Sequence, residues 1–186
     1  MGNYEFKAMR LIADVFDRND LHYTSYSKCF DGQKHETIEV HFPVDCGPEV
    51  TMRFICKEDG NDVAIRIFGL LTRIPIEKRF RILEACNALN EKSRYPKFYL
   101  DTDGDVNVEC DIPSRCSDNC VGEVAYEMLR YTSYLLDDEY ETFMKYLYSD
   151  TVVNQMLREM RKRWDNQFNM DEETNTDDLD EICEED

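Results

Sequence analysis

The strongest constraint in this sequence is an alternation of apolar and polar residues in several short segments between residues 21 and 112. The alternating apolar sets are Ile38, Val40 and Phe42; Val50, Met52 and Phe54; Val63, Ile65 and Ile67; and Val106, Val108, Cys110 and Ile112. A period of two places such residues on one face of a strand, and the residues between them are mostly polar. This pattern indicates an antiparallel sheet that helices cover on one side only.

Glycine-containing turns separate these segments. The turn candidates are Asp31-Gly32, Cys46-Gly47-Pro48, Asp59-Gly60 and Asp103-Gly104. Asp-Gly tolerates the positive φ that tight hairpins require. The sequence therefore predicts a four-strand meander, followed later by a separate hairpin.

Helical spacing surrounds the strand segments. Residues 4–17 form one predicted helix, and a second begins after Pro75, with Phe80, Leu83, Cys86 and Asn90 on one stripe. A third is expected from Asp118, its candidate N-cap, to residue 136, with further helical pieces at 139–149 and 151–164. The predicted class is α+β, an antiparallel sheet of a four-strand meander plus a later hairpin with helices on one face.

The acidic residues are distributed unevenly along the 186-residue chain. Residues 171–186 hold ten acidic residues and no Lys or Arg, which leaves 30 acidic residues against 22 basic residues in the remainder. We expect one domain at residues 1–150, a helical extension at 151–169 and an acidic tail at 170–186 of a composition typical of disorder. The body is also acidic, which disfavours nucleic acid as a partner.

The expected location is cytoplasmic. Residues 1–20 carry charges throughout and lack the apolar core of a secretory signal. No apolar run approaches the length of a membrane span, so no membrane partner is expected. In this compartment the eight cysteines should be mostly reduced.

Two groups of residues could bind a metal ion. Asp101, Asp103 and Asp105 alternate around Gly104 as in the opening of a calcium loop. Such a loop would also need glycine at position 106 and glutamate at 112, where this chain has valine and isoleucine. The simpler interpretation is a hairpin turn with acidic flanks.

Cys110, Cys116 and Cys120 form the second group, but neither a second cysteine pair nor a nearby histidine completes a zinc set. His22, His35 and His41 fit surface positions better than metal ligands. No phosphate loop or nucleophile elbow is present. We expect no enzyme activity, cofactor or metal; a small metal-binding protein or enzyme using the Asp101–Asp105 turn or these thiols is the alternative.

One stretch resembles a known family. It contains Asn87-Ala88-Leu89-Asn90-Glu91, then Lys97-Phe98-Tyr99-Leu100-Asp101, Asp103-Gly104-Asp105-Val106 and a long amphipathic helix after Pro113. This arrangement resembles the YbjN family of bacterial proteins, described as sensory or stress-response regulators. The resemblance implies a fold similar to type III secretion chaperones, which are usually dimeric and hold an extended client segment.

The favoured hypothesis is a non-enzymatic protein-binding module that forms a homodimer. A partner segment would pair with an exposed strand edge or sheet face. Four aromatic residues fit the core stripes poorly and are the candidate contacts: Tyr23, Tyr26, Phe30 and Tyr99. Ordinary packing at an edge strand is the alternative explanation for each.

Overall fold

The computed structural model describes residues 4–45, 47–57, 62–113 and 119–151, together with 154–155, 158–159 and 162. The chain divides into two units, Met1–Leu147 and Tyr148–Asp186. The predicted extension at 151–169 lies largely outside the described residues. The predicted acidic tail at 170–186 lies entirely outside them.

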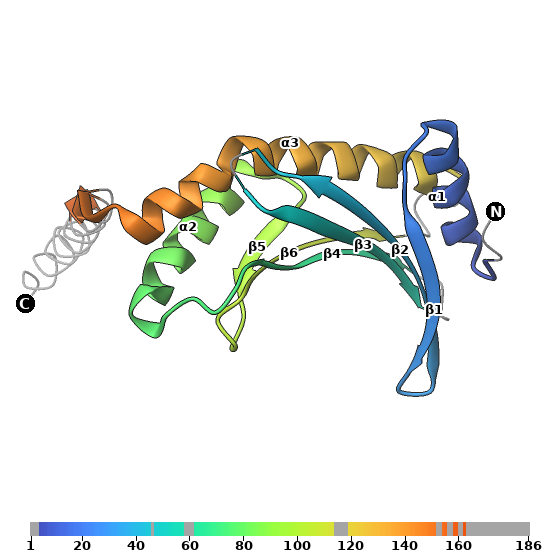
Figure 1. Cartoon of the computed structure of the whole chain (residues 1–186), viewed down its shortest axis with the longest axis horizontal. Helices are drawn as coiled ribbons and strands as arrows, with labels where there is room; N and C mark the ends of the chain where they lie inside the picture. The colour runs from blue at the N-terminus through green and yellow to red at the C-terminus, as the bar shows by residue number, and fades with distance from the viewer. Residues whose placement is uncertain are drawn as a thin grey trace, which may run out of the picture. The chain divides into compact units, whose positions relative to one another are not determined.

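The first unit is an α+β fold, as predicted. Its elements, of which only the last ends one residue beyond Leu147, are α1 (Lys7–Arg18), β1 (Thr24–Phe30), β2 (Gln33–Pro43), β3 (Glu49–Lys57), β4 (Asp62–Leu71), the 3₁₀ turn η1 (Ile76–Lys78), α2 (Arg79–Lys92), β5 (Lys97–Leu100), β6 (Val106–Pro113) and α3 (Val121–Tyr148). The strands form one antiparallel sheet in the order β1-β2-β3-β4-β6-β5. Figure 1 shows α3 running along the sheet, with α1 near one end of α3 and α2 near the other.

The strand register confirms the predicted apolar face. Ile38 lies opposite Phe54, and Phe54 lies opposite Ile65. Ile65 in turn lies opposite Cys110 on β6. The opposite face carries a polar row in which each residue faces the next across the ladder: Glu39, Arg53, Arg66 and Glu109.

The helices pack against the apolar face. The ring of Phe16 on α1 meets Phe54 on β3 edge to face, with 5.3 Å between ring centroids. Phe143 on α3 meets Phe98 on β5 at 5.5 Å. Gly122 in the first turn of α3 lies so close to α1 that a Cβ atom there would overlap the carbonyl oxygen of Leu11. The core therefore lies between the helices and one face of the sheet.

Two of the predicted turns are confirmed. Asp31 and Gly32 join β1 to β2 with φ values of 50° and 77°, and Gly104 between β5 and β6 has a φ of 90°. All three φ values lie in the left-handed region that Asp-Gly turns use. Asp59-Gly60 and Cys46 fall outside the described residues.

The structure corrects the predicted stripe on the second helix. Cys86 of that stripe is buried as predicted, but Phe80 and Leu83 are 49% and 44% exposed. The residues that α2 buries are Ile82, Ala85, Cys86 and Leu89. The helix carries apolar residues on two faces, so its periodicity cannot by itself decide which face meets the sheet.

The third helix also differs from its prediction. Instead of separate pieces meeting near residue 137, α3 continues for 28 residues from Val121 to Tyr148. Its buried residues include Leu136, Tyr140 and Phe143, so one continuous apolar stripe crosses the predicted boundary. The expected N-cap, Asp118, lies outside the described residues.

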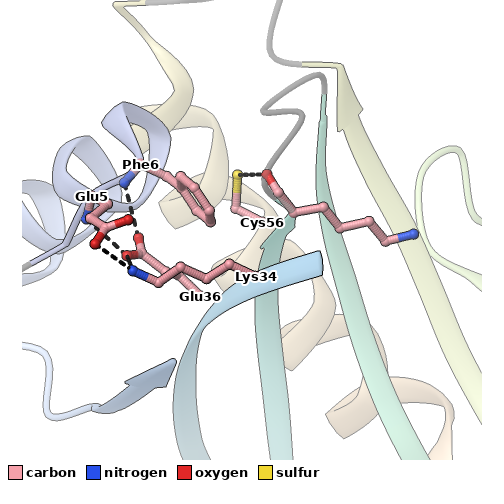
Figure 2. A network of polar contacts seen from close by, with 6 residues as sticks. Glu5, Phe6, Lys34, Glu36 and Cys56 are labelled. Carbon is pink, nitrogen blue, oxygen red and sulfur yellow. Dashed lines mark hydrogen bonds and ion pairs between the residues drawn. The ribbon is translucent and has the colours of Figure 1, made fainter. Parts of the chain in front are cut away.

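A buried carboxylate on β2 fixes the start of α1. Glu36 is fully buried, and its two oxygens accept hydrogen bonds from the backbone N–H groups of Glu5 and Phe6 at 2.8 and 3.1 Å. Lys34 pairs with Glu5 at 2.7 Å and lies 3.8 Å from Glu36 (Figure 2). The first turn of α1 has no side-chain cap of its own. Glu36 therefore supplies the negative charge that a helix N-terminus favours.

Candidate partner-binding edge

The four predicted contact residues do not form one cluster. Tyr23 lies immediately before β1, and Tyr26 and Phe30 lie on β1 itself. Tyr99 lies on β5. Because β1 and β5 are the opposite ends of the strand order, the structure divides the predicted contacts between two edges.

The β5 edge is closed by α2. The side-chain amide of Asn90 donates to the carbonyl oxygen of Phe98 at 2.9 Å, and its own oxygen accepts from the Phe98 N–H at 2.7 Å. Lys97 also donates to the carbonyl oxygen of Ser93 at 2.6 Å. Asn90 therefore occupies main-chain groups that an added strand would need. Tyr99 belongs to this closed edge, and burial, with the nearby Glu109 carboxylate, raises its pKa.

The β1 edge is open in the described part of the chain. β1 pairs in an unbroken seven-residue register with β2, and every residue except Tyr26 is exposed. Natural proteins usually guard such edges with charges, proline or bulges. The sequence of β1 contains one charged residue, Lys28, and neither proline nor glycine. This strand therefore offers main-chain groups to a further strand.

Aromatic side chains line one face of this open edge. The hydroxyl of Tyr26 donates to Glu39 at 3.0 Å, and the ammonium of Lys28 lies 4.7 Å from the centroid of the Tyr26 ring. Phe30 is 67% exposed, and its ring centroid lies 6.3 Å from that of the His35 ring on β2. Tyr26 is held in place, whereas Phe30 presents most of its ring to solvent.

Glu39 provides the fixed support beneath Tyr26. Partial burial raises the pKa of Glu39, but hydrogen bonds from Arg53, at 2.6 Å, and from Tyr26 outweigh it, so the pKa lies below its usual range. Glu39 therefore remains ionised at neutral pH and keeps accepting the Tyr26 hydrogen bond.

Tyr23 has a structural role instead. Its ring packs edge to face on Phe16 at 5.9 Å, and its hydroxyl donates to Asp17 at 2.9 Å. Burial, followed by the hydrogen bond to Asp17, raises the pKa of Tyr23 well above its usual range. Tyr23 thus joins α1 to the start of β1.

Two of the aspartates considered for metal binding, Asp101 and Asp105, accept hydrogen bonds from within their hairpin or from the segment after β4, and Asp103 is exposed. Asp101 accepts hydrogen bonds from the N–H of Asp105 at 2.9 Å and from the side chain of Asn107 at 2.8 Å. These two donors lower the pKa of Asp101. Asp105 accepts from the N–H of Arg73 at 2.7 Å. The geometry matches the hairpin interpretation of this turn.

The thiols considered for metal binding lie in unlike environments. Cys110 is half-buried, with its sulfur 4.0 Å from that of Met128, and burial raises its pKa. Cys120 is exposed, and Cys116 falls outside the described residues. Within the described ranges, no group of three or more His, Cys, Asp or Glu side chains is arranged to hold a metal ion.

A second apolar surface lies on the outside of α2. Ile76 is 81% exposed, and Phe80 and Leu83 follow at spacings of four and three residues. Asn87 continues the same stripe and is also exposed. We call Ile76, Phe80, Leu83 and Asn87 the outer stripe of α2. Apolar residues on both faces of a helix are typical of one that packs on two sides.

Comparison with known protein families gives one match. A family model named YbjN, described as "putative bacterial sensory transduction regulator", matches residues 12–119, more than half of the chain. The chain belongs to the YbjN family. The YbjN match includes all six strands and α2, hence both sheet edges. No curated protein and no solved structure matches the chain.

No helix in the part of the chain that the structure describes combines the length and the apolar character needed to cross a membrane.

Two features that organise this YbjN fold were not predicted from the sequence. Asn90 belongs to the stretch that resembles the YbjN family, but its role in closing the sheet edge depends on Phe98, eight residues away on β5. Glu36 looks like one more acidic residue in an acidic chain, and its burial depends on a helix about 30 residues earlier. A glutamate on the apolar face of an alternating strand was the available signal for Glu36.

Proposed function

We propose that this YbjN-family chain is a non-enzymatic regulatory module that binds an extended segment of a protein partner by strand addition at β1. The observation that carries the proposal is the contrast between the sheet edges. Asn90 closes the β5 edge, whereas β1 exposes six of its seven residues. A partner strand would extend the sheet by main-chain hydrogen bonds, the mode known as β-augmentation.

The side chains of β1 would give this binding its selectivity. Successive side chains of an added strand point to opposite faces, so alternate partner residues meet different surroundings. On one face they meet Tyr26 and Phe30. On the other they meet Ser25 and Ser27, which lie opposite Ile38 and Glu36 on β2. The proposed ligand is therefore an extended segment with apolar residues at every second position.

The test begins by selecting peptides from a displayed random library on the full chain. Phe30→Ala removes the exposed ring, and Ser27→Lys places a guarding charge on the edge. We expect each variant to weaken binding of a selected peptide about tenfold or more. Tyr134→Ala is the matched control, because Tyr134 is an exposed aromatic residue on α3.

Amide hydrogen exchange then locates the bound peptide. Strand addition should slow exchange at alternate residues of β1, because only every second residue of an antiparallel strand bonds to a given neighbour. Peptides that bind without protecting β1, and whose affinity is unchanged in Phe30→Ala and Ser27→Lys, would refute the proposal.

We also propose that the protein is a homodimer whose second copy covers the outer stripe of α2. On α2, Phe80 and Leu83 follow the a and d positions of a heptad, and Asn87 falls at the next a position; Ile76 precedes them on η1. A single asparagine at such a position specifies register in paired helices. Two copies of the same stripe would meet in a self-complementary two-fold contact.

A further inference from the structure

A groove lies between β6 and the first half of α3, separate from both surfaces discussed above. Its volume is about 420 Å³, within the range of small-molecule sites. Its lining residues are Tyr95, Cys110, Asp111, Ile112, Pro113, Glu123, Val124, Glu127 and Met128. Most of the lining is apolar, so the groove suits a ligand with an apolar body.

The charged groups in this lining all have the same sign. Asp111 stands on β6, and Glu123 and Glu127 stand one turn apart on α3. No basic side chain is among the lining residues that the structure describes. Hydrogen bonds from Arg18 lower the pKa of Glu123, which keeps this carboxylate ionised at neutral pH.

Each of these carboxylates also pairs with an arginine that is not among the lining residues. The pairs are Arg66 with Asp111 at 2.6 Å, Arg18 with Glu123 at 2.9 Å and Arg130 with Glu127 at 3.3 Å. All three carboxylates are more than half exposed. Exposed ion pairs are weak, so the carboxylates remain able to attract a further cation.

Main-chain groups of β6 border the same groove. The last residue pair between β5 and β6 is Lys97 with Glu109. Beyond it, residues 110–113 pair with β4 only, within the described part of the chain. Small-molecule sites usually combine an apolar lining with a few polar or charged groups that orient the ligand, and this groove has both.

We propose that this groove binds a small organic cation with an apolar body and an ammonium head, such as an arylalkylamine. The apolar part would lie against Ile112, Val124 and Met128, and the ammonium would lie at the carboxylate rim. This inference goes beyond the proposed function, since the groove is formed by β6 and α3 rather than β1.

The test compares three probes of similar shape on the full chain: 2-phenylethylamine, 2-phenylethanol and 3-phenylpropanoate. Binding is followed by titration calorimetry and by methyl NMR shifts of Val124 and Met128. We expect the amine to bind about two- to fivefold more tightly than the alcohol, and the carboxylate to bind most weakly. Val124→Phe, which fills the groove, should abolish binding of all three probes.

The charge requirement is tested with the double variant E123Q/E127Q. Both side chains are exposed, so the fold should be retained, and binding of the amine should fall to the level of the alcohol. The matched control is E141Q, on the same helix, where Glu141 pairs with Lys145 at 3.1 Å outside the groove. It should leave amine binding unchanged, as should Phe30→Ala.

Three results would overturn the inference. The first is equal binding of amine, alcohol and carboxylate, and the second is no binding of the amine up to its solubility limit. The third is binding of an extended lysine-containing peptide that shifts the Val124 and Met128 methyl signals when the amine does not. Loss of peptide binding at β1 would refute the proposed function alone, because the amine assay does not depend on that edge.

Discussion

Single residues join segments that are distant in the sequence of this protein. Glu36 on β2 caps the first turn of α1, and Asp101 organises the turn between β5 and β6. Both are carboxylates that accept two hydrogen bonds, and both differ from the many acidic residues that face solvent. Their effects on stability can be separated by substitution.

Replacing Glu36 should strongly destabilise the fold. Glu36→Ala removes both acceptors for the first turn of α1, and we expect the free energy of unfolding to fall by roughly 2–3 kcal/mol. Glu36→Gln keeps one acceptor oxygen and should lose less. Urea denaturation measures both, with Glu49→Ala on an exposed position of β3 as the control. Equal stability of Glu36→Ala and the control would contradict this role.

Asp101 should make the stability depend on acid pH. Its pKa is lowered in the folded state, so its contribution is fully present above the unfolded pKa of about 4. That contribution is lost as the pH falls through the lower, folded pKa. The stability difference between wild type and Asp101→Asn should therefore be constant from neutral pH to about pH 5, and should shrink at about pH 3.

The control for Asp101 is Asp103→Asn in the same turn, whose side chain is exposed. Its stability difference from wild type should change much less over the same pH range. The two variants are compared by urea unfolding at each pH. If the stability difference between wild type and Asp101→Asn stays constant down to about pH 3, the Asp101 carboxylate does not cause the pH dependence.

At the scale of elements, the two edges of the sheet are treated differently by the helices. α2 presents Asn90 to β5, so one short edge strand is paired with a side chain instead of a neighbouring strand. At the other end, β1 is seven residues long and has no equivalent partner in the described residues. The strand most available for pairing is thus decided by where α2 lies.

Substitution of Asn90 should open the β5 edge. Asn90→Ala removes both hydrogen bonds to Phe98, and we expect it to cost about 2 kcal/mol of stability. Amide exchange at Phe98 should become faster. Asn90→Asp keeps the acceptor and should preserve protection of the Phe98 N–H. Glu91→Ala, at the exposed neighbouring position, is the control, and the same exchange rate at Phe98 in all variants would refute the assignment.

At the scale of the whole molecule, the main question is how the exposed apolar surfaces are covered. Isolated apolar residues on a surface are common, but the outer stripe of α2 is periodic and runs from Ile76 on η1 to Asn87 on α2. A second copy of the chain would cover this stripe symmetrically. This distinguishes it from Tyr134, an exposed aromatic residue on α3 that is not part of such a stripe.

Phe80→Glu should convert the proposed dimer to a monomer. The introduced carboxylate would be buried beside an apolar partner surface, which is unfavourable, whereas in the monomer Phe80 is already half exposed. Sedimentation velocity over a concentration series measures the change. Tyr134→Glu should leave the dimer intact. A wild-type protein that stays monomeric at high concentration would reject the dimer.

Local patterns predicted much of the sheet. Strand faces follow from alternation, because consecutive side chains must point to opposite sides wherever a strand forms. The Asp31-Gly32 and Asp103-Gly104 turns follow from the backbone conformations these residues tolerate. The candidate contacts on β1 also came from local reasoning, since Tyr26 and Phe30 did not fit a core stripe; their binding role stays a prediction.

The sequence by itself thus determined the α+β class, the meander, the hairpin and the family. Tertiary structure decided that β5, not β6, forms the sheet edge, that α2 buries Ile82 rather than Phe80, and that Asn90 closes one edge while β1 stays open. The physical reason is the distance along the sequence between the residues that interact. Alternation and turn conformation depend on neighbouring residues, whereas edge position and helix orientation depend on contacts that form only when distant segments pack together.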